Sequence, residues 1–206
     1  MQPFTQHEGL VVPLLRANID TDQIIPKQFL KRTERTGYGD FLFYDWRCGA
    51  NGTPTSDFIL NQPSMKAGSI LLAGKNFGCG SSREHAAWAL LDYGFRVVIA
   101  PSFGDIFAIN AEKNGILTVT LPDLEIAYLG DMATQKNGYC LVVDLETCVI
   151  RDACGWKTEF SINDHRRRCL LEGLDEIGAT LLLREKITAY ERQRPALSVS
   201  GNRATF

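Results

Sequence analysis

The residues best suited to chemistry lie in one stretch, AGKNFGCGSSREHAAWAL, at positions 73–90. Three glycines, Gly74, Gly78 and Gly80, precede a predicted helix, so the backbone there can adopt dihedral angles closed to other residues and can approach a ligand closely. The free amides and the positive dipole at a helix start attract anions. The stretch therefore predicts a site for a small acidic ligand.

The side chains after the last glycine indicate how such a site would work. Ser81 and Glu84 have the S-x-x-E spacing of a capping box, which predicts that the helix begins at the end of the glycine loop. Arg83 offers a planar fork of donors that matches a carboxylate or a phosphate. An alternative stays equally open, in which Ser81 is only a cap, Arg83 is a surface charge and His85 points to solvent.

Several familiar motifs do not fit this stretch. Serines follow Gly80, whereas a P-loop needs Lys and then Ser or Thr after its last glycine. Arg83 stands where the dinucleotide fingerprint has its third glycine. The string CGSSR also lacks the G-x-S-x-G of a nucleophile elbow. Nucleotide binding is therefore not favoured.

A regular alternation of elements surrounds the glycine loop. SILLAG, RVVIA and ILTVTL are typical of buried strands, and SSREHAAWALLDYG and FGDIFAINAEKNG are typical of helices. Each helix ends at a glycine, Gly94 or Gly115, where a left-handed residue is needed. Strands that alternate with helices predict an α/β domain with parallel strand pairs.

The rest of the chain predicts additions to this unit. The run from residue 7, broken by Pro13, indicates a strand at the sheet edge. Residues 20–22, Asp-Thr-Asp, favour a tight turn or a helix start, and a long loop with short helical pieces follows at about 27–57. Residues 139–162 indicate antiparallel strands, and closing helices follow. We expect one domain over 1–192 and a flexible tail over 193–206.

Composition limits the partners of the chain. Twenty-two Lys and Arg against 24 Asp and Glu give a net charge of -2, so we expect no nucleic-acid partner. No apolar run is long enough for a membrane span and no signal peptide is visible, so we expect a cytoplasmic protein. The six cysteines form no CxxC pair, so we expect mostly free thiols, buried or partly so, and no metal site in this chain. The two other histidines stand apart from further ligand types, and HRRR at 165–168 suggests a solvated helix face.

Three strings, GKNFGCGSSREHAAWAL, NIDTDQIIPKQFLKR and LLEGLDEIG, closely resemble the small subunits of bacterial 3-isopropylmalate dehydratases, members of the aconitase superfamily. The resemblance implies a swivelling β/β/α domain with a mixed sheet and C-terminal helices, which closes over a separate large subunit to form a heterodimer. It implies a hydro-lyase of leucine biosynthesis, active only with that partner. The [4Fe-4S] cluster of the family belongs to the large subunit, so this chain would bind no cofactor.

The same resemblance implies roles for individual residues. Ser81 would be the base that takes a carbon-bound proton, while Ser82 and Arg83 would hold a substrate carboxylate. Asp22 would orient a catalytic histidine of the partner, although it can equally be a turn residue that caps its own backbone. Supporting positions are Gly78, Gly80, Glu84 and His85, the last of which we expect to be structural or to support the site indirectly.

The same resemblance implies that the FLKR string lies in a loop that sorts substrates in the superfamily. Lys31 and Arg32 are therefore candidate substrate-binding residues, or else solvated charges. Phe29 and Leu30 could form an apolar wall for an isopropyl group, or belong to the core. Two other functions stay open: a related hydro-lyase acting on citraconate, dimethylmaleate or homoaconitate, and a non-catalytic domain that binds a small dicarboxylate.

Overall fold

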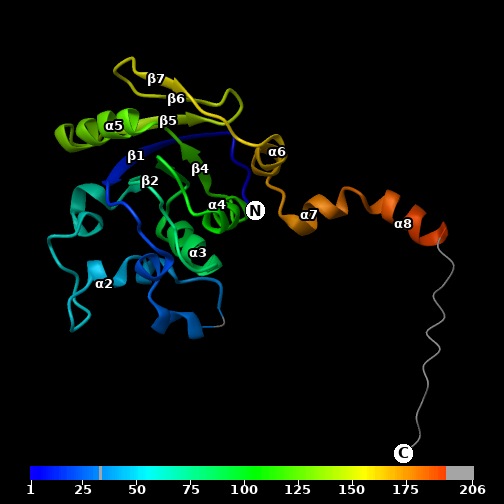
Figure 1. The fold of residues 1–206 in the computed structure, drawn as a ribbon, viewed down its shortest axis with the longest axis horizontal. Coiled ribbons are helices and arrows are strands. Elements are labelled where there is room, and N and C mark those ends of the chain that lie inside the picture. Colours follow the sequence, from blue (N-terminus) through cyan, green and yellow to red (C-terminus); the bar gives the residue numbers. More distant parts are fainter. Residues whose placement is uncertain (33, 194–206) are drawn as a thin grey trace, which may run out of the picture.

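The computed structural model describes residues 1–32 and 34–193. Within these residues a seven-stranded sheet has the order β4-β3-β2-β1-β5-β6-β7 (Figure 1). Strands β1 to β4 are parallel, and β5 to β7 continue the sheet in antiparallel pairing. The strands are β1 (Gln6–Leu14), β2 (Gly68–Ala73), β3 (Val97–Ala100), β4 (Leu117–Thr120), β5 (Cys140–Asp144), β6 (Val149–Arg151) and β7 (Lys157–Glu159).

Most of the predicted helices are present in the structure, which also contains one α-helix that was not predicted. Helix α5 was not predicted, whereas the strand and helix alternation of β2, α3, β3, α4 and β4 is as expected. In the described part of the chain the α-helices are α1 (Thr21–Ile24), α2 (Tyr44–Arg47), α3 (Glu84–Tyr93), α4 (Asp105–Lys113), α5 (Asp123–Gln135), α6 (Asp164–Glu172), α7 (Glu176–Leu181) and α8 (Arg184–Gln193). Short 3-10 helices are η1 (Lys27–Lys31), η2 (Gly39–Phe41), η3 (Ile59–Asn61) and η4 (Pro63–Met65).

Successive side chains of the central strands point to opposite faces of the sheet, so the core is divided between the two faces. Leu71 and Ala73 of β2 face one cluster, which includes apolar residues of α3, α4 and the 27–65 region. Ile70 and Leu72 face the other cluster, which includes residues of α5, α6 and the antiparallel strands. This period of two is the pattern of a sheet that is covered on both sides. The expected α/β class, with a mixed sheet and C-terminal helices, is confirmed.

The prediction that the first strand lies at the sheet edge was wrong. β1 is central, between β2 and β5. Pro13 is tolerated because β5 pairs only with Gln6–Leu10, so the side of β1 that faces β5 has no strand partner at Pro13. The proline thus marked the end of a strand pairing and not the edge of the sheet.

The glycines that were expected to end helices do so. Gly94 is the C-cap of α3 with φ 117°, and Gly115 follows α4 with φ 89°. At the C-terminal end of the described chain, α7 and α8 extend away from the sheet (Figure 1). The expected tail at 193–206 lies outside the described residues except for Gln193, which ends α8. None of the described helices combines the length and hydrophobicity of a membrane span.

Candidate active site

The glycine loop, residues 74–83, joins β2 to α3 and is held by backbone hydrogen bonds from both sides. Gly78 N donates to Ile19 O at 2.7 Å, and Thr21 N donates to Cys79 O at 2.9 Å. On the other side, Phe77 N donates to Ser102 O at 3.0 Å. The loop therefore has a fixed course between the segment before α1 and the segment before α4.

Two glycines of this loop have backbone angles that favour glycine. Gly78 and Gly80 have φ 73° and 94°. A Cβ at Gly78 would lie 2.2 Å from Phe107 Cγ, while at Gly80 the nearest atom, Asp20 Cβ, would be 3.5 Å away. Gly78 is therefore required by both backbone angle and space, and Gly80 by backbone angle alone.

Ser81 and Ser82 are exposed on the last part of the loop. Ser81 O accepts hydrogen bonds from Thr21 Oγ1 at 3.0 Å and from Arg83 N at 2.9 Å. Within the described residues, no hydrogen bond to Ser81 Oγ is found. The backbone of Ser81 is thus fixed, whereas its hydroxyl has no hydrogen-bond partner among the described residues.

The predicted capping box of Ser81 and Glu84 was wrong. Helix α3 begins at Glu84, its N-cap is Arg83, and no side chain caps it. The hydrogen bond from Arg83 N to Ser81 O closes a tight turn ahead of the helix, so Ser81 stays outside the first helical turn. A capping box occurs instead at α1, where Asp20 and Gln23 bond each other's backbone, which confirms the expected helix start there.

Helix α1 places an acidic side chain against the start of α3. Asp22 forms ion pairs with Arg83 and with Lys27, the latter at 3.3 Å. The Arg83 side chain is 15% exposed, so it is largely enclosed and not the surface charge of the alternative interpretation. One side of its guanidinium is engaged by Asp22, which fixes the orientation of the group.

The candidate residues of the 27–57 loop lie at its outer part. Lys31 and Arg32 are exposed. Arg32 lies 5.2 Å from the ring centroid of Phe41 and 3.8 Å from the Glu34 carboxylate. Phe29 stacks on Phe41 at 4.0 Å and is partly buried, so it combines core contact with an accessible edge.

His85 lies between two aromatic rings. Its ring centroid is 5.4 Å from that of Tyr38 and 4.6 Å from that of Trp88. Burial lowers the pKa of His85 below its ordinary value, although the neighbouring Glu84 charge acts in the opposite direction. The imidazole is therefore neutral near pH 7, which fits a packing role.

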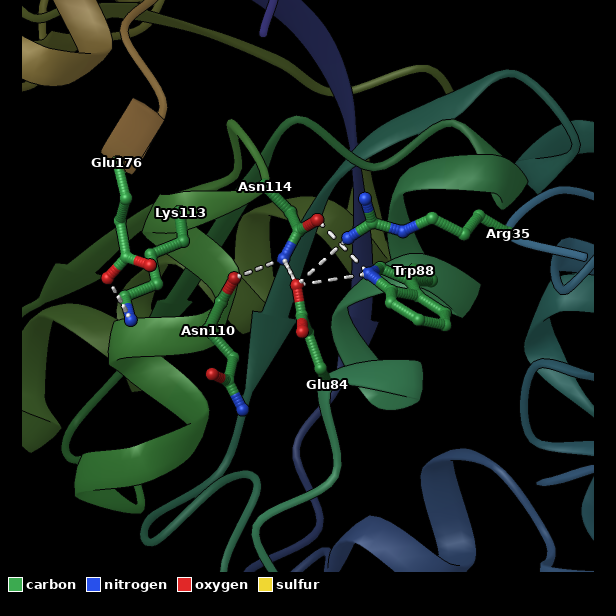
Figure 2. A network of polar contacts seen from close by, with 7 residues as sticks. All are labelled: Arg35, Glu84, Trp88, Asn110, Lys113, Asn114 and Glu176. Atoms are coloured by element: carbon green, nitrogen blue, oxygen red, sulfur yellow. Dashed lines mark hydrogen bonds and ion pairs between the residues drawn. The ribbon is translucent and has the colours of Figure 1, made fainter. Parts of the chain in front are cut away.

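A polar network at the start of α3 was not found by sequence reasoning. Glu84 Oε1 accepts from Asn114 Nδ2 at 2.9 Å and from Trp88 Nε1 at 3.3 Å, and Arg35 Nη2 lies 3.4 Å away (Figure 2). Asn114 follows α4, so the network joins two helices and the 27–57 loop. No local pattern indicates these partners, because Asn114 and Glu84 are 30 residues apart.

The HRRR run is not simply a solvated face. Arg166 forms an ion pair with the buried Glu112 at 3.2 Å, and Arg167 donates to Leu145 O at 3.0 Å. Burial raises the pKa of Glu112, and Arg166 opposes that shift. The interpretation was wrong for these two arginines, because Arg166 is the partner of a buried carboxylate and Arg167 is bonded to a backbone oxygen.

The six cysteines are all free, as expected, but Cys140 and Cys154 are exposed. Among the residues that the structure describes, no group of three or more His, Cys, Asp and Glu side chains could hold a metal ion. The donor set for an iron-sulfur cluster is thus lacking in this part of the chain. Neither His7 nor His165 belongs to such a group.

Comparisons with known proteins agree with this architecture. The family model of the aconitase C-terminal domain matches residues 1–124. The 3-isopropylmalate dehydratase small subunit of Brevibacillus brevis is 56% identical over 94% of this chain and 100% of its own length. The protein of the same name from Rhodopirellula baltica is 56% identical over the same shares of both chains.

A solved structure supports the fold independently. The crystal structure of 3-isopropylmalate dehydratase from Methanocaldococcus jannaschii has a TM-score of 0.64 and 26% identity, and covers 90% of this chain and 99% of its own. The fold expected from the resemblance, an aconitase-type α/β domain, is therefore confirmed. The chain belongs to the family of 3-isopropylmalate dehydratase small subunits, in the aconitase superfamily.

Proposed function

We propose that this chain is the small subunit of a leucine-biosynthetic hydro-lyase, which interconverts 2-isopropylmalate and 3-isopropylmalate through 2-isopropylmaleate. It acts in a heterodimer with a large subunit that completes the site. The names of relatives at 56% identity support this reaction class. The observation that carries the proposal for this chain is the exposed Ser81, whose hydroxyl has no partner among the described residues and whose backbone is fixed on the loop before α3.

Ser81 is the proton-transferring residue of the proposal. Its oxygen, as an alkoxide, takes a proton from the substrate carbon, and the electron pair of that C–H bond becomes the new double bond as hydroxide leaves the neighbouring carbon. Each tenfold gain in the alkoxide fraction takes about 1.36 kcal/mol of extra stabilisation. The positive end of α3 and the adjacent Arg83 guanidinium favour negative charge at this position. Exclusion of water by the partner would strengthen both effects.

Departure of the hydroxide needs an electrophile. Because the described residues lack a cluster-binding set, the proposal assigns the [4Fe-4S] cluster to the large subunit, where it would serve as a Lewis acid. This chain then contributes the base and part of the carboxylate site. Neither subunit should be active alone.

Carboxylate binding is assigned to Ser82 and Arg83. The ion pair with Asp22 supports this role, since it holds the Arg83 guanidinium in one orientation. Asp22 is 41% exposed, so in the assembled enzyme its carboxylate can also orient a histidine of the partner. Lys31 and Arg32 form the outer, specificity-determining part of the site.

The test is turnover of the assembled two-subunit enzyme, reconstituted anaerobically. Ser81→Ala should reduce kcat roughly 10²- to 10⁴-fold, the usual contribution of a general acid–base group. Ser64→Ala, which changes an exposed serine of η4, is the matched control and should keep full activity. Near-normal turnover by Ser81→Ala, with assembly and cluster content intact, would refute the role of Ser81.

The same preparation separates the alternatives. Citraconate, dimethylmaleate and homoaconitate serve as competing substrates, and the highest kcat/KM identifies the hydro-lyase. If the assembled enzyme turns over none of these compounds while the chain alone binds a dicarboxylate, the non-catalytic binding function replaces the proposal.

A further inference from the structure

One exposed side chain docks the 27–57 loop on the start of α3. The Arg35 guanidinium lies 3.4 Å from Glu84 Oε1 and stands 4.8 Å from the ring centroid of Trp88 (Figure 2). Both contacts reach the first two turns of the helix that follows Ser81. Arg35 thus joins the loop with the candidate cations to the helix at the centre of the site.

Hydrogen bonds to Asn114, which follows α4, hold the surface that receives Arg35. Glu84 Oε1 accepts from Asn114 Nδ2, and Trp88 Nε1 also donates to Asn114 Oδ1 at 3.1 Å. Asn114 Nδ2 in turn donates to Asn110 O at 2.8 Å, so α4 fixes the amide. The acceptor is therefore preorganised, and the Arg35 side chain can dock on it or leave it without displacing Glu84.

The other end of the docked segment, residues 34–38, is permanently anchored. Tyr38 is fully buried, its N donates to Asp92 Oδ2 at 2.9 Å, and its ring lies 5.7 Å from that of Trp88. Arg35, by contrast, has a side chain that is 69% exposed. Of the two attachments, the Arg35 contact is the one that can be released.

Arg32 contacts this segment as well as Phe41. Its guanidinium lies 3.8 Å from Glu34 and 5.9 Å from the ring centroid of Tyr38. The Tyr38 hydroxyl also donates to Arg32 O at 3.3 Å. Movement of residues 34–37, which precede the anchored Tyr38, would therefore displace Glu34, the ion-pair partner of Arg32.

We propose that Arg35 is a positioning residue, which docks residues 34–38 on Glu84 and Trp88 and thereby holds Arg32 in place for substrate. The inference rests on the proposed function, in which Arg32 belongs to the substrate-binding loop. An exposed ion pair and an exposed cation–π contact are each weak, so their loss should raise KM by roughly 3- to 10-fold. Because Ser81 and its loop are untouched, kcat should stay within about twofold.

The experiment compares variants of the assembled two-subunit enzyme with 2-isopropylmalate. Arg35→Ala should raise KM, and Arg35→Lys should recover most of the loss, since the contact with Glu84 is a single N–O approach and not a bidentate fork. Arg168→Ala is the matched control, because it removes an ion pair of α6 whose arginine side chain is 65% exposed. It should leave KM unchanged. An unchanged KM in Arg35→Ala, or a fall in kcat alone, would overturn the proposal.

Hydrogen exchange of the full chain supplies a readout that does not require activity. Peptides that cover residues 34–38 should exchange faster in Arg35→Ala than in the wild type or in Arg168→Ala, while peptides from α4 stay the same. If the wild-type enzyme turns over no isopropylmalate, the proposed function is wrong, and the exchange comparison alone decides whether Arg35 docks the segment. Equal exchange in all three proteins would show that it does not.

Discussion

Gly78→Ala is the substitution whose effect follows most directly from the site geometry. The new Cβ would lie 2.2 Å from Phe107 Cγ and 2.5 Å from Phe107 Cβ. Phe107 is 2% exposed and packs against Phe77 and Phe103, with ring centroids 5.1 and 6.3 Å away. Because these rings leave Phe107 little room to retreat, the glycine loop itself has to move.

Two destabilising effects add in Gly78→Ala. An alanine with the left-handed backbone of Gly78, φ 73°, loses about 1–2 kcal/mol. Overpacking against a buried ring adds about 1–3 kcal/mol. We therefore expect the free energy of unfolding to fall by about 2–5 kcal/mol. Gly138 isolates the first cost, since its φ is 78° and a Cβ there would meet no atom within 4 Å. Gly138→Ala should lose only about 1–2 kcal/mol.

Urea unfolding of the purified chain, followed by circular dichroism, measures both losses. Turnover of the assembled enzyme under native conditions then reports the position of Ser81, because a displacement of about 1 Å at a reacting group can cost roughly 100-fold in rate. Gly78→Ala should lose activity and Gly138→Ala should keep it. Equal destabilisation by the two substitutions, or full turnover by Gly78→Ala, would refute the reasoning from the Phe107 contact.

Two further predictions concern stability. Asp20→Ala removes the side-chain cap that accepts from Gln23 N at 2.8 Å, so the free energy of unfolding, measured in urea, should fall by about 1 kcal/mol. Asp20→Asn keeps a capping oxygen and should therefore retain most of the stability of the wild type. Equal losses in the two variants would contradict a capping role. Burial, and secondarily Arg96, lowers the pKa of His7 below 6.5, so the unfolded chain takes up the proton first. The stability that His7 contributes is complete above that pH and is lost as the pH falls through the folded-state pKa. His7→Gln, which can keep the bond to Ser69, should weaken the decline below about pH 6.5. An unchanged decline would argue against this origin.

Local spacing was enough to predict the central unit of the fold. Between residues 69 and 121 each segment has the pattern of apolar residues that is typical of a strand or of a helix. Gly94 and Gly115 end their helices because a left-handed backbone favours glycine wherever the helix lies in the molecule. The position of β1 was not predictable in this way. Its sequence shows where pairing with β5 must end, at Pro13, but not which strands flank it, since strand order depends on contacts far apart in the chain.

The candidate site likewise has one part that was predictable from the sequence and another that was not. By itself the sequence placed a glycine loop with Ser81 between a strand and a helix, because that loop is one continuous segment of the chain. Only the tertiary structure decided that Glu84 faces Asn114 and not Ser81, that Asp22 fixes Arg83, and that Arg35 docks the loop on α3. These partners come from separate elements, so their pairing is fixed by how the helices and loops pack around the sheet, and no single segment of the sequence contains that information.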